Sequence, residues 1–118
     1  MPAPAVELLR GSLDLLILRS LTQRALHGYA VMRGIDDATS SAVQIEEGSL
    51  YPALYRLVDR EWIESDWGVS ENNRRARYYA LTPKGRLQLK AEVREFTRFA
   101  NAMFQALSFP EPARGTHA

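Results

Sequence analysis

The chain lacks several features that would identify a function at once. It has no cysteine, which excludes disulfide bonds and thiolate metal sites and favours a cytosolic protein. Its histidines, His27 and His117, are too far apart to form a metal site with carboxylates at ligand spacing. It has no glycine-rich loop that would cradle a phosphate group, so we expect no cofactor. We also find no nucleophile with an orienting partner and no suitable carboxylate pair, and we expect no enzyme activity.

Long apolar runs are missing as well. The stretch LDLLILRSL is too short to cross a bilayer, and the opening MPAPAVELLRGS lacks the basic start and apolar core of a signal peptide. We therefore expect no membrane partner and a cytoplasmic location. A length of 118 residues, with 46% apolar and 25% charged residues, is typical of one ordinary globular protein with a single core.

Charge is distributed unevenly. The net charge of +1 does not by itself mark a nucleic-acid-binding protein. However, acidic residues gather in the third of the chain before Arg74, and the segment that follows contains none. A basic segment of this kind can follow a phosphate backbone while the rest of the molecule stays soluble. Its basic residues are Arg74, Arg75, Arg77, Lys84, Arg86 and Lys90.

The most informative part of the chain runs from Gly48 to Gly85. It begins with a helical pattern in which apolar residues recur at i, i+4, i+7 and i+8, namely Leu50, Leu54, Leu57 and Val58. Small polar groups and arginine read base edges and phosphates in the DNA major groove, whereas the alternative reading of such a face is simple solvation. The face opposite the leucines carries Ser49, Tyr51, Pro52, Tyr55 and Arg56.

Two predicted strands follow this helix. Ile63–Trp67 and Arg77–Leu81 are rich in Ile, Trp and Tyr, and GVSENNRRA between them supplies Gly, Asn and Ser for a turn. Arg74, Arg75 and Arg77 stand at the predicted tip. The order of helix, strand, turn and strand predicts a winged helix-turn-helix. This is a mainly α fold with a small β-hairpin, and we assign residues 1–85 to it as the DNA-binding domain.

Two further helices are predicted before this reading helix. The first runs from near Gly11 or Ser12 to about Thr22 and is apolar nearly all round, so it needs cover on two sides. The second runs from near Gly28 to about Ala38, and its predicted core residues are Tyr29 or Ala30, Met32 and Ile35.

A long last helix is predicted to start at Thr82, which can cap it, and Pro83, which fits its first turn. Apolar residues then recur at spacings of three and four, as in a coiled-coil seam. A helix of about 25 residues is about 37 Å long, so its far half needs a partner, most simply a second copy. We predict a C-terminal dimerisation helix over residues 86–108 and a disordered tail over residues 109–118. The predicted dimer interface comprises Leu13, Leu16, Leu89, Val93, Phe96, Phe99, Ala100, Met103 and Leu107.

Four runs of sequence resemble, in order, those of one known family. They are LDLLILRSL, LHGYAVMRGI, GSLYPALYRL and RRARYYALTPKG, and they cover roughly Leu9 to Leu89. The chain thus resembles the PadR family of bacterial transcriptional regulators, and QIEEGSLYPAL with WGVSENNRRARYYALT looks like the subgroup first recognised in acidobacterial genomes. The resemblance implies a homodimeric regulator, in particular a repressor, that binds double-stranded DNA.

This resemblance assigns roles to the candidate residues. We expect the reading helix to enter the major groove and the wing arginines to contact phosphates or the adjacent minor groove. Tyr29 could reach a phosphate, although a core tyrosine is an equal alternative, and Lys84 could reach the backbone or be solvated. The residues predicted to bind DNA are Tyr29, Ser49, Tyr51, Pro52, Tyr55, Arg56, Arg74, Arg75, Arg77 and Lys84.

An effector is also implied, because relatives release DNA when aromatic or drug-like ligands bind between their subunits. Drug-binding relatives place a tryptophan of each last helix in that cavity, but this chain has none after Trp67. Phe96 and Phe99 could line an effector pocket instead, although such spacing is typical of plain interface packing. Two alternatives stay open, a winged helix used for protein contacts and a small-molecule sensor acting at the dimer interface.

Overall fold

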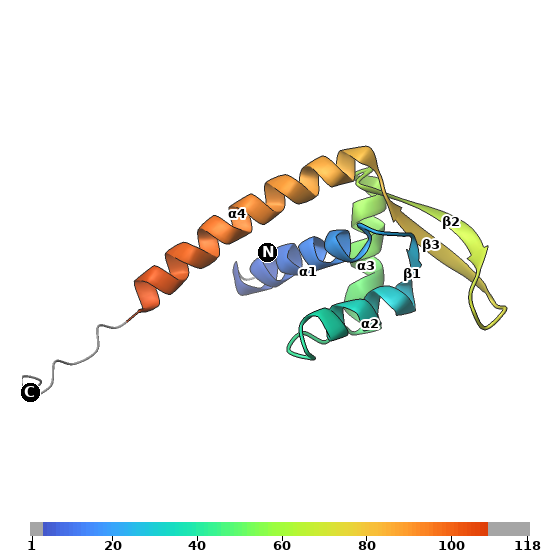
Figure 1. The fold of residues 1–118 in the computed structure, drawn as a ribbon, viewed down its shortest axis with the longest axis horizontal. Helices are drawn as coiled ribbons and strands as arrows, with labels where there is room; N and C mark the ends of the chain where they lie inside the picture. The colour runs from blue at the N-terminus through green and yellow to red at the C-terminus, as the bar shows by residue number, and fades with distance from the viewer. Residues whose placement is uncertain (1–3, 109–118) are drawn as a thin grey trace, which may run out of the picture.

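A computed structural model describes residues 4–108, so the predicted tail over residues 109–118 lies outside the described part. Three helices pack beside a small sheet, and a long fourth helix lies against α1 and projects beyond it (Figure 1). The predicted fold, a mainly α winged helix-turn-helix with a long C-terminal helix, is confirmed. The elements in order are α1 (Pro4–Ser20), β1 (Leu26–His27), α2 (Gly28–Ala38), α3 (Glu47–Asp59), β2 (Ile63–Val69), β3 (Arg75–Leu81) and α4 (Pro83–Leu107).

α1 begins earlier than predicted. The expected start near Gly11 or Ser12 is wrong, because the helix extends back to Pro4, and it ends at Ser20. Proline suits the first turn of a helix, where its missing N–H has no partner to lose. A glycine inside a helix costs only about 1 kcal/mol relative to alanine, which is too little to end a helix that good helix formers continue on both sides.

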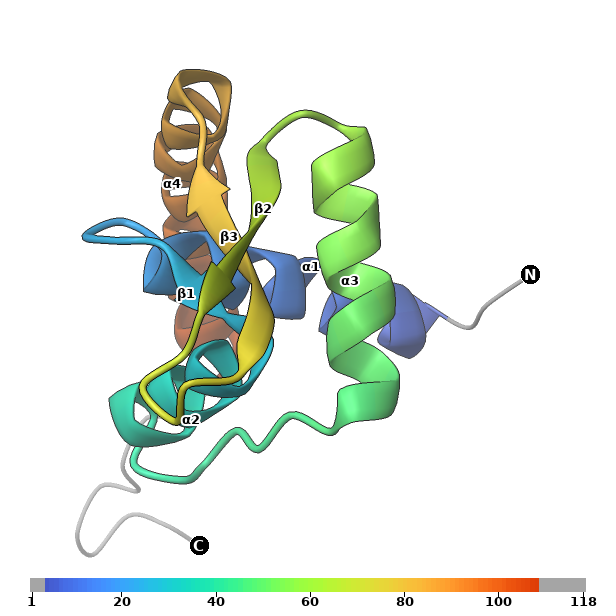
Figure 2. The ribbon, with the colours of Figure 1, turned by 90° about the vertical axis from the view of Figure 1, so that its right-hand side faces the viewer.

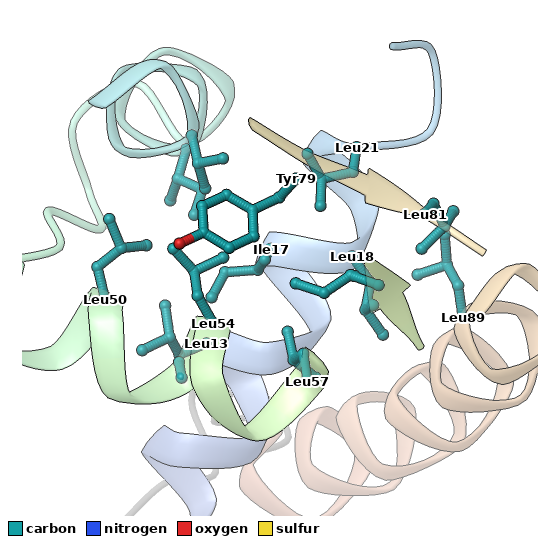
Figure 3. Packing of buried hydrophobic residues seen from close by; sticks show 14 residues of the cluster. Leu13, Ile17, Leu18, Leu21, Leu50, Leu54, Leu57, Tyr79, Leu81 and Leu89 are labelled. Atoms are coloured by element: carbon teal, nitrogen blue, oxygen red, sulfur yellow. The ribbon is translucent and has the colours of Figure 1, made fainter. Parts of the chain in front are cut away.

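The core lies between α1, α3 and the sheet. Ile17 and Leu18 of α1 are fully buried at its centre (Figure 3). The predicted apolar stripe of α3 is confirmed, since Leu50, Leu54 and Leu57 are buried and Val58 is half-buried. Leu13 and Leu89 were predicted to lie in the dimer interface. A single subunit already buries both in this core and leaves only 9% and 8% of them exposed, so they are core residues.

α2 has the predicted bounds but a different buried face. Its fully buried residues are Gly28, Val31 and Ile35, at i, i+3 and i+7. Met32 is half-buried against the core, whereas Tyr29 is 58% exposed and takes no part in it. The core assignment was therefore right for Ile35 and wrong for Tyr29, its alternative Ala30 is only half-buried, and Val31 occupies the inner position instead.

The sheet has three antiparallel strands in the order β1-β3-β2. β2 and β3 each extend the predicted strand by two residues toward the tip, where Val69 pairs with Arg75. β1 was not predicted, because its two residues are too few to show an alternating pattern. It pairs with Tyr78 and Tyr79 of β3 and thereby ties the start of α2 to the hairpin.

The predicted start of α4 is confirmed. The Thr82 hydroxyl oxygen accepts a hydrogen bond from the backbone N–H of Gly85 at 2.9 Å and donates to the Glu61 carbonyl at 2.7 Å. Gly85 lies so close to the Trp62 carbonyl that a β-carbon there would overlap it. The first turn of α4 is therefore clamped against the turn that follows α3. Within residues 4–108, no helix is long and apolar enough to span a membrane.

Candidate nucleic-acid interface

α3 presents a polar and aromatic face opposite its buried leucines. Ser49, Pro52 and Tyr55 are exposed, and Tyr55 is the most open of them at 79%. Glu46 is the N-cap residue and Glu47 the first residue of the helix, where a carboxylate complements the positive end of the helix dipole. This arrangement leaves hydroxyl and phenol groups available on the outer surface of α3.

Tyr51 is held in place by the first residue of α2. Its side chain is 46% exposed, and its phenol lies against Gly28, where a β-carbon would come within 2.7 Å of the hydroxyl oxygen and 3.0 Å of the ring. Only glycine permits this contact without displacing the ring. The absence of a side chain at position 28 therefore leaves room for the Tyr51 phenol beside the start of α2.

Arg56 does not lie free on this face. One of its guanidinium nitrogens donates to the Asp14 carboxylate of α1 at 2.8 Å, and its side chain is only 28% exposed. Arg60 lies 3.9 Å from the other carboxylate oxygen. Burial raises the pKa of Asp14 above its ordinary value and outweighs the two arginines, which lower it. The structure thus argues against base reading by Arg56 and makes it a link between α3 and α1, which no local sequence pattern predicts.

The wing comprises β2, β3 and the turn at residues 70–74. The turn closes with a hydrogen bond from the Ser70 N–H to the Arg74 carbonyl at 2.8 Å, and Asn73 adopts the left-handed conformation that asparagine tolerates. Arg74 stands in the turn, whereas Arg75 and Arg77 lie within β3 rather than at the tip. All three are exposed, and within residues 4–108 none of them lies within 4.0 Å of a carboxylate oxygen.

A groove of about 430 Å³ separates the wing from the start of α2. Tyr29 and Arg33 line one wall, with the Arg33 guanidinium 5.0 Å from the centre of the Tyr29 ring, and Arg74 and Arg75 line the other. His27 caps α2 by accepting the Ala30 N–H at 3.2 Å. The structure thus brings Tyr29 together with two wing arginines and adds Arg33, which no sequence pattern indicated.

The wing tip and the N-terminal half of α3 lie toward the same end of the molecule (Figure 2). Lys84 is exposed in the first turn of α4, at the opposite end of the hairpin. It is therefore not gathered with the other candidate residues. Within the described residues, no group of three or more His, Cys, Asp or Glu side chains is placed to hold a metal ion.

The far half of α4 keeps its predicted seam uncovered in a single subunit. Ala100 and, on α1, Leu16 are half-buried. Phe96 also lines an apolar groove of about 630 Å³ between α1, the connection after α2 and the start of α3. The exposed fractions of the other seam side chains lie between 42% and 59%, for Val93, Phe96, Phe99, Met103 and Leu107.

Helix α3 and the adjacent wing with its three exposed arginines define a winged helix-turn-helix protein of the nucleic-acid-binding class. Residues 17–91 match the model of the transcriptional regulator PadR-like family. The chain is 32% identical over 90 residues to an uncharacterised protein of Lysinibacillus sphaericus, which covers 76% of this chain and 83% of that protein. The chain belongs to the PadR-like family of transcriptional regulators, whose members bind DNA.

Solved structures agree with this assignment. A transcriptional regulator from Clostridium thermocellum superposes with a TM-score of 0.77 and 28% identity, over 86% of this chain and 99% of that one. A PadR-like transcriptional regulator from Bacillus cereus gives a TM-score of 0.73 and 26% identity, over 88% and 99% of the two chains. Both structural matches cover most of this chain, so the similarity is not limited to the wing.

Proposed function

We propose that this protein is a sequence-specific repressor that binds a pseudo-palindromic DNA operator as a homodimer. One observation carries the proposal: the exposed phenols of α3 and the wing arginines, which have no carboxylate partner in the described part of the chain, lie on elements that reach toward the same end of the molecule (Figure 2). Guanidinium groups left unpaired on a surface are available for phosphates. Membership of the acidobacterial subgroup stays a prediction.

In this proposal the two DNA-binding elements have different tasks. Ser49, Tyr51, Pro52 and Tyr55 meet base edges in the major groove, because they stand on the exposed face of the helix. The DNA backbone runs past the mouth of the groove between the wing and α2, within reach of Arg33 and the wing arginines, while the Glu71 carboxylate in the same lining lies 3.5 Å from His27. Arg56 stabilises the reading helix through its ion pair with Asp14. Lys84 would contact a different part of the DNA backbone, because it lies at the opposite end of the hairpin.

The exposed seam of α4 supports the dimer. Phenylalanine, methionine and leucine side chains recur along one face with nothing to cover them in the subunit, and pairing with a second α4 would bury them. Two reading helices fit consecutive major grooves on one face of B-DNA when they stand about 34 to 36 Å apart. The operator should therefore contain half-sites about 10 to 11 base pairs apart or a small multiple of that spacing.

A ligand response is the third part of the proposal. The apolar groove beside Phe96 reaches the connection that leads into α3, so an aromatic or drug-like molecule there would touch both the dimer helix and the reading helix. Phe99 lines a smaller groove of about 310 Å³ on the same helix. Of the two alternatives, a protein-contact module would leave duplex DNA unbound, whereas a small-molecule sensor that acts at the dimer interface is compatible with DNA binding.

A footprint on the promoter region beside the protein's own gene tests the DNA-binding part. A protected pseudo-palindrome supports the proposal, whereas salt-resistant binding to a protein and none to duplex DNA would favour the protein-contact module. Sedimentation of Phe96→Asp tests the dimer, with Lys90→Asp as a charge control on the exposed polar face of the same helix. A charge in the seam should give monomers or insoluble protein, and a stable Phe96→Asp dimer would contradict the proposed interface.

A further inference from the structure

The inner face of the wing carries an exposed tryptophan between two arginines. The Arg75 guanidinium carbon lies 4.3 Å from the centre of the Trp67 ring, and the Arg77 guanidinium carbon lies 5.4 Å from it. The Nε of Arg77 also donates to the Ser65 hydroxyl at 3.1 Å. Trp67 is nevertheless 52% exposed, so burial in the core does not explain an aromatic side chain here.

Strand pairing places these residues on one face. Trp67 pairs with Arg77 and Ser65 pairs with Tyr79, and alternate residues of a strand point to the same side. Nearer the base of the hairpin, the same face carries Ile63 and Tyr79, which pack into the core with α3. Trp67 and the two arginines therefore lie on the same face of the hairpin as the residues that pack against α3, but outside the core and nearer the tip of the wing.

We propose that Trp67 is a positioning residue for DNA binding, whose ring holds the guanidinium groups of Arg75 and Arg77 where they meet the DNA backbone. The inference rests on the proposed function, because it concerns how the wing binds DNA. Long arginine side chains lose rotamer freedom when they bind, and a ring that restricts them beforehand lowers that cost. Stacking occupies the flat face of a guanidinium and leaves the N–H groups at its edge free for phosphate oxygens.

The test is a double-mutant cycle for affinity to the footprinted operator, measured at several salt concentrations on the full-length protein. Trp67→Leu should weaken binding about five- to thirtyfold, the value of two exposed cation–π contacts. Trp67→Phe keeps an aromatic face and should stay within about threefold of wild type. In the Arg75→Ala, Arg77→Ala background, Trp67→Leu should have almost no further effect, because there is nothing left to position.

A second pair of variants tests the same point if Trp67→Leu does not fold. Arg75→Lys keeps the charge but loses the planar group that stacks on indole, so it should weaken binding in the wild type and have almost no effect in Trp67→Thr, which keeps a strand-forming residue but has no ring to stack on. Trp62→Leu is the control matched to Trp67→Leu, because Trp62 also stacks with an arginine, Arg60 at 5.1 Å, but lies at the base of the hairpin. It should leave the operator affinity unchanged.

The outcomes separate this inference from the proposed function. Equal losses for Trp67→Leu with and without the two arginines would overturn the inference, since Trp67 would then act on DNA without them. An unchanged affinity for Trp67→Leu would overturn it as well. If the wild-type protein binds no duplex DNA in the same assay, the proposed function itself fails.

Discussion

Arg56 of α3 and Arg75 of the wing stand on the two elements that carry the candidate DNA site, yet their surroundings differ. The Arg56 guanidinium is tied to the buried carboxylate of Asp14, whereas the Arg75 guanidinium stacks on an exposed indole and has no carboxylate within 4.0 Å among the described residues. An arginine that neutralises a buried charge maintains the fold, and one held by an aromatic ring keeps its charge available to a ligand. The same residue type therefore serves stability at one position and binding at the other.

The largest expected effect comes from breaking the buried pair. Arg56→Ala should lower the free energy of unfolding by about 2 to 4 kcal/mol, because it leaves Asp14 with a buried charge and only the more distant Arg60. Urea unfolding measures this loss. The matched variant Arg75→Ala should stay within about 0.5 kcal/mol of wild type, and similar losses for the two would remove the contrast.

In the wing we expect the opposite result, a loss of DNA affinity without a loss of stability. The Arg74→Ala, Arg75→Ala double variant should keep its stability but bind all duplex sequences more weakly. The slope of log affinity against log salt should fall by about 0.9 for each phosphate contact that is lost, or about two in total. Binding curves at several salt concentrations check this, and an unchanged slope would mean that these two arginines do not touch the DNA backbone.

A glycine on the reading side sharpens the comparison further. Gly28→Ala should push the Tyr51 phenol from its place and weaken operator binding about three- to tenfold while leaving binding to random DNA nearly unchanged. Gly34→Ala is the control within the same helix, since a β-carbon there meets nothing within 4 Å and should stabilise the protein by about 0.5 to 1 kcal/mol. Equal operator affinities for the two variants would show that the position of Tyr51 does not matter.

The smallest effect is on pH dependence. Because burial raises the pKa of Asp14 above its ordinary value of 3.8, the native state takes up this proton at a higher pH than the unfolded chain does. The resulting stability is present below 3.8 and is lost as the pH rises through the raised native pKa. Asp14→Asn should flatten this part of the stability curve, and Arg56→Ala, which removes a group that lowers the pKa, should steepen it. Thermal unfolding between pH 3.5 and 7 is the measurement, and parallel curves for the three proteins would contradict the assignment.

Local patterns in the sequence predicted the helices and strands that carry the candidate DNA-binding site. The leucine spacing of α3, the alternating strands of the wing and the Thr82–Pro83 start of α4 all involve residues within about one helical turn or one strand pair. Hydrogen bonding and side-chain periodicity act over these distances, so the sequence indicates them directly. The family resemblance added the biological class, which the family match confirmed.

The contacts that distinguish the arginines arise from packing between distant segments. Asp14 and Arg56 are 42 residues apart and meet only because α1 lies across α3. β1 is a strand only because β3 offers an edge beside it, and Leu13 and Leu89 join one subunit's core because α4 folds back on α1. Sequence by itself thus determined the presence of the four helices and the two wing strands, and the apolar stripe of α3. Tertiary structure decided which charges are neutralised and which remain free, because neutralisation depends on what another segment brings within a few ångströms.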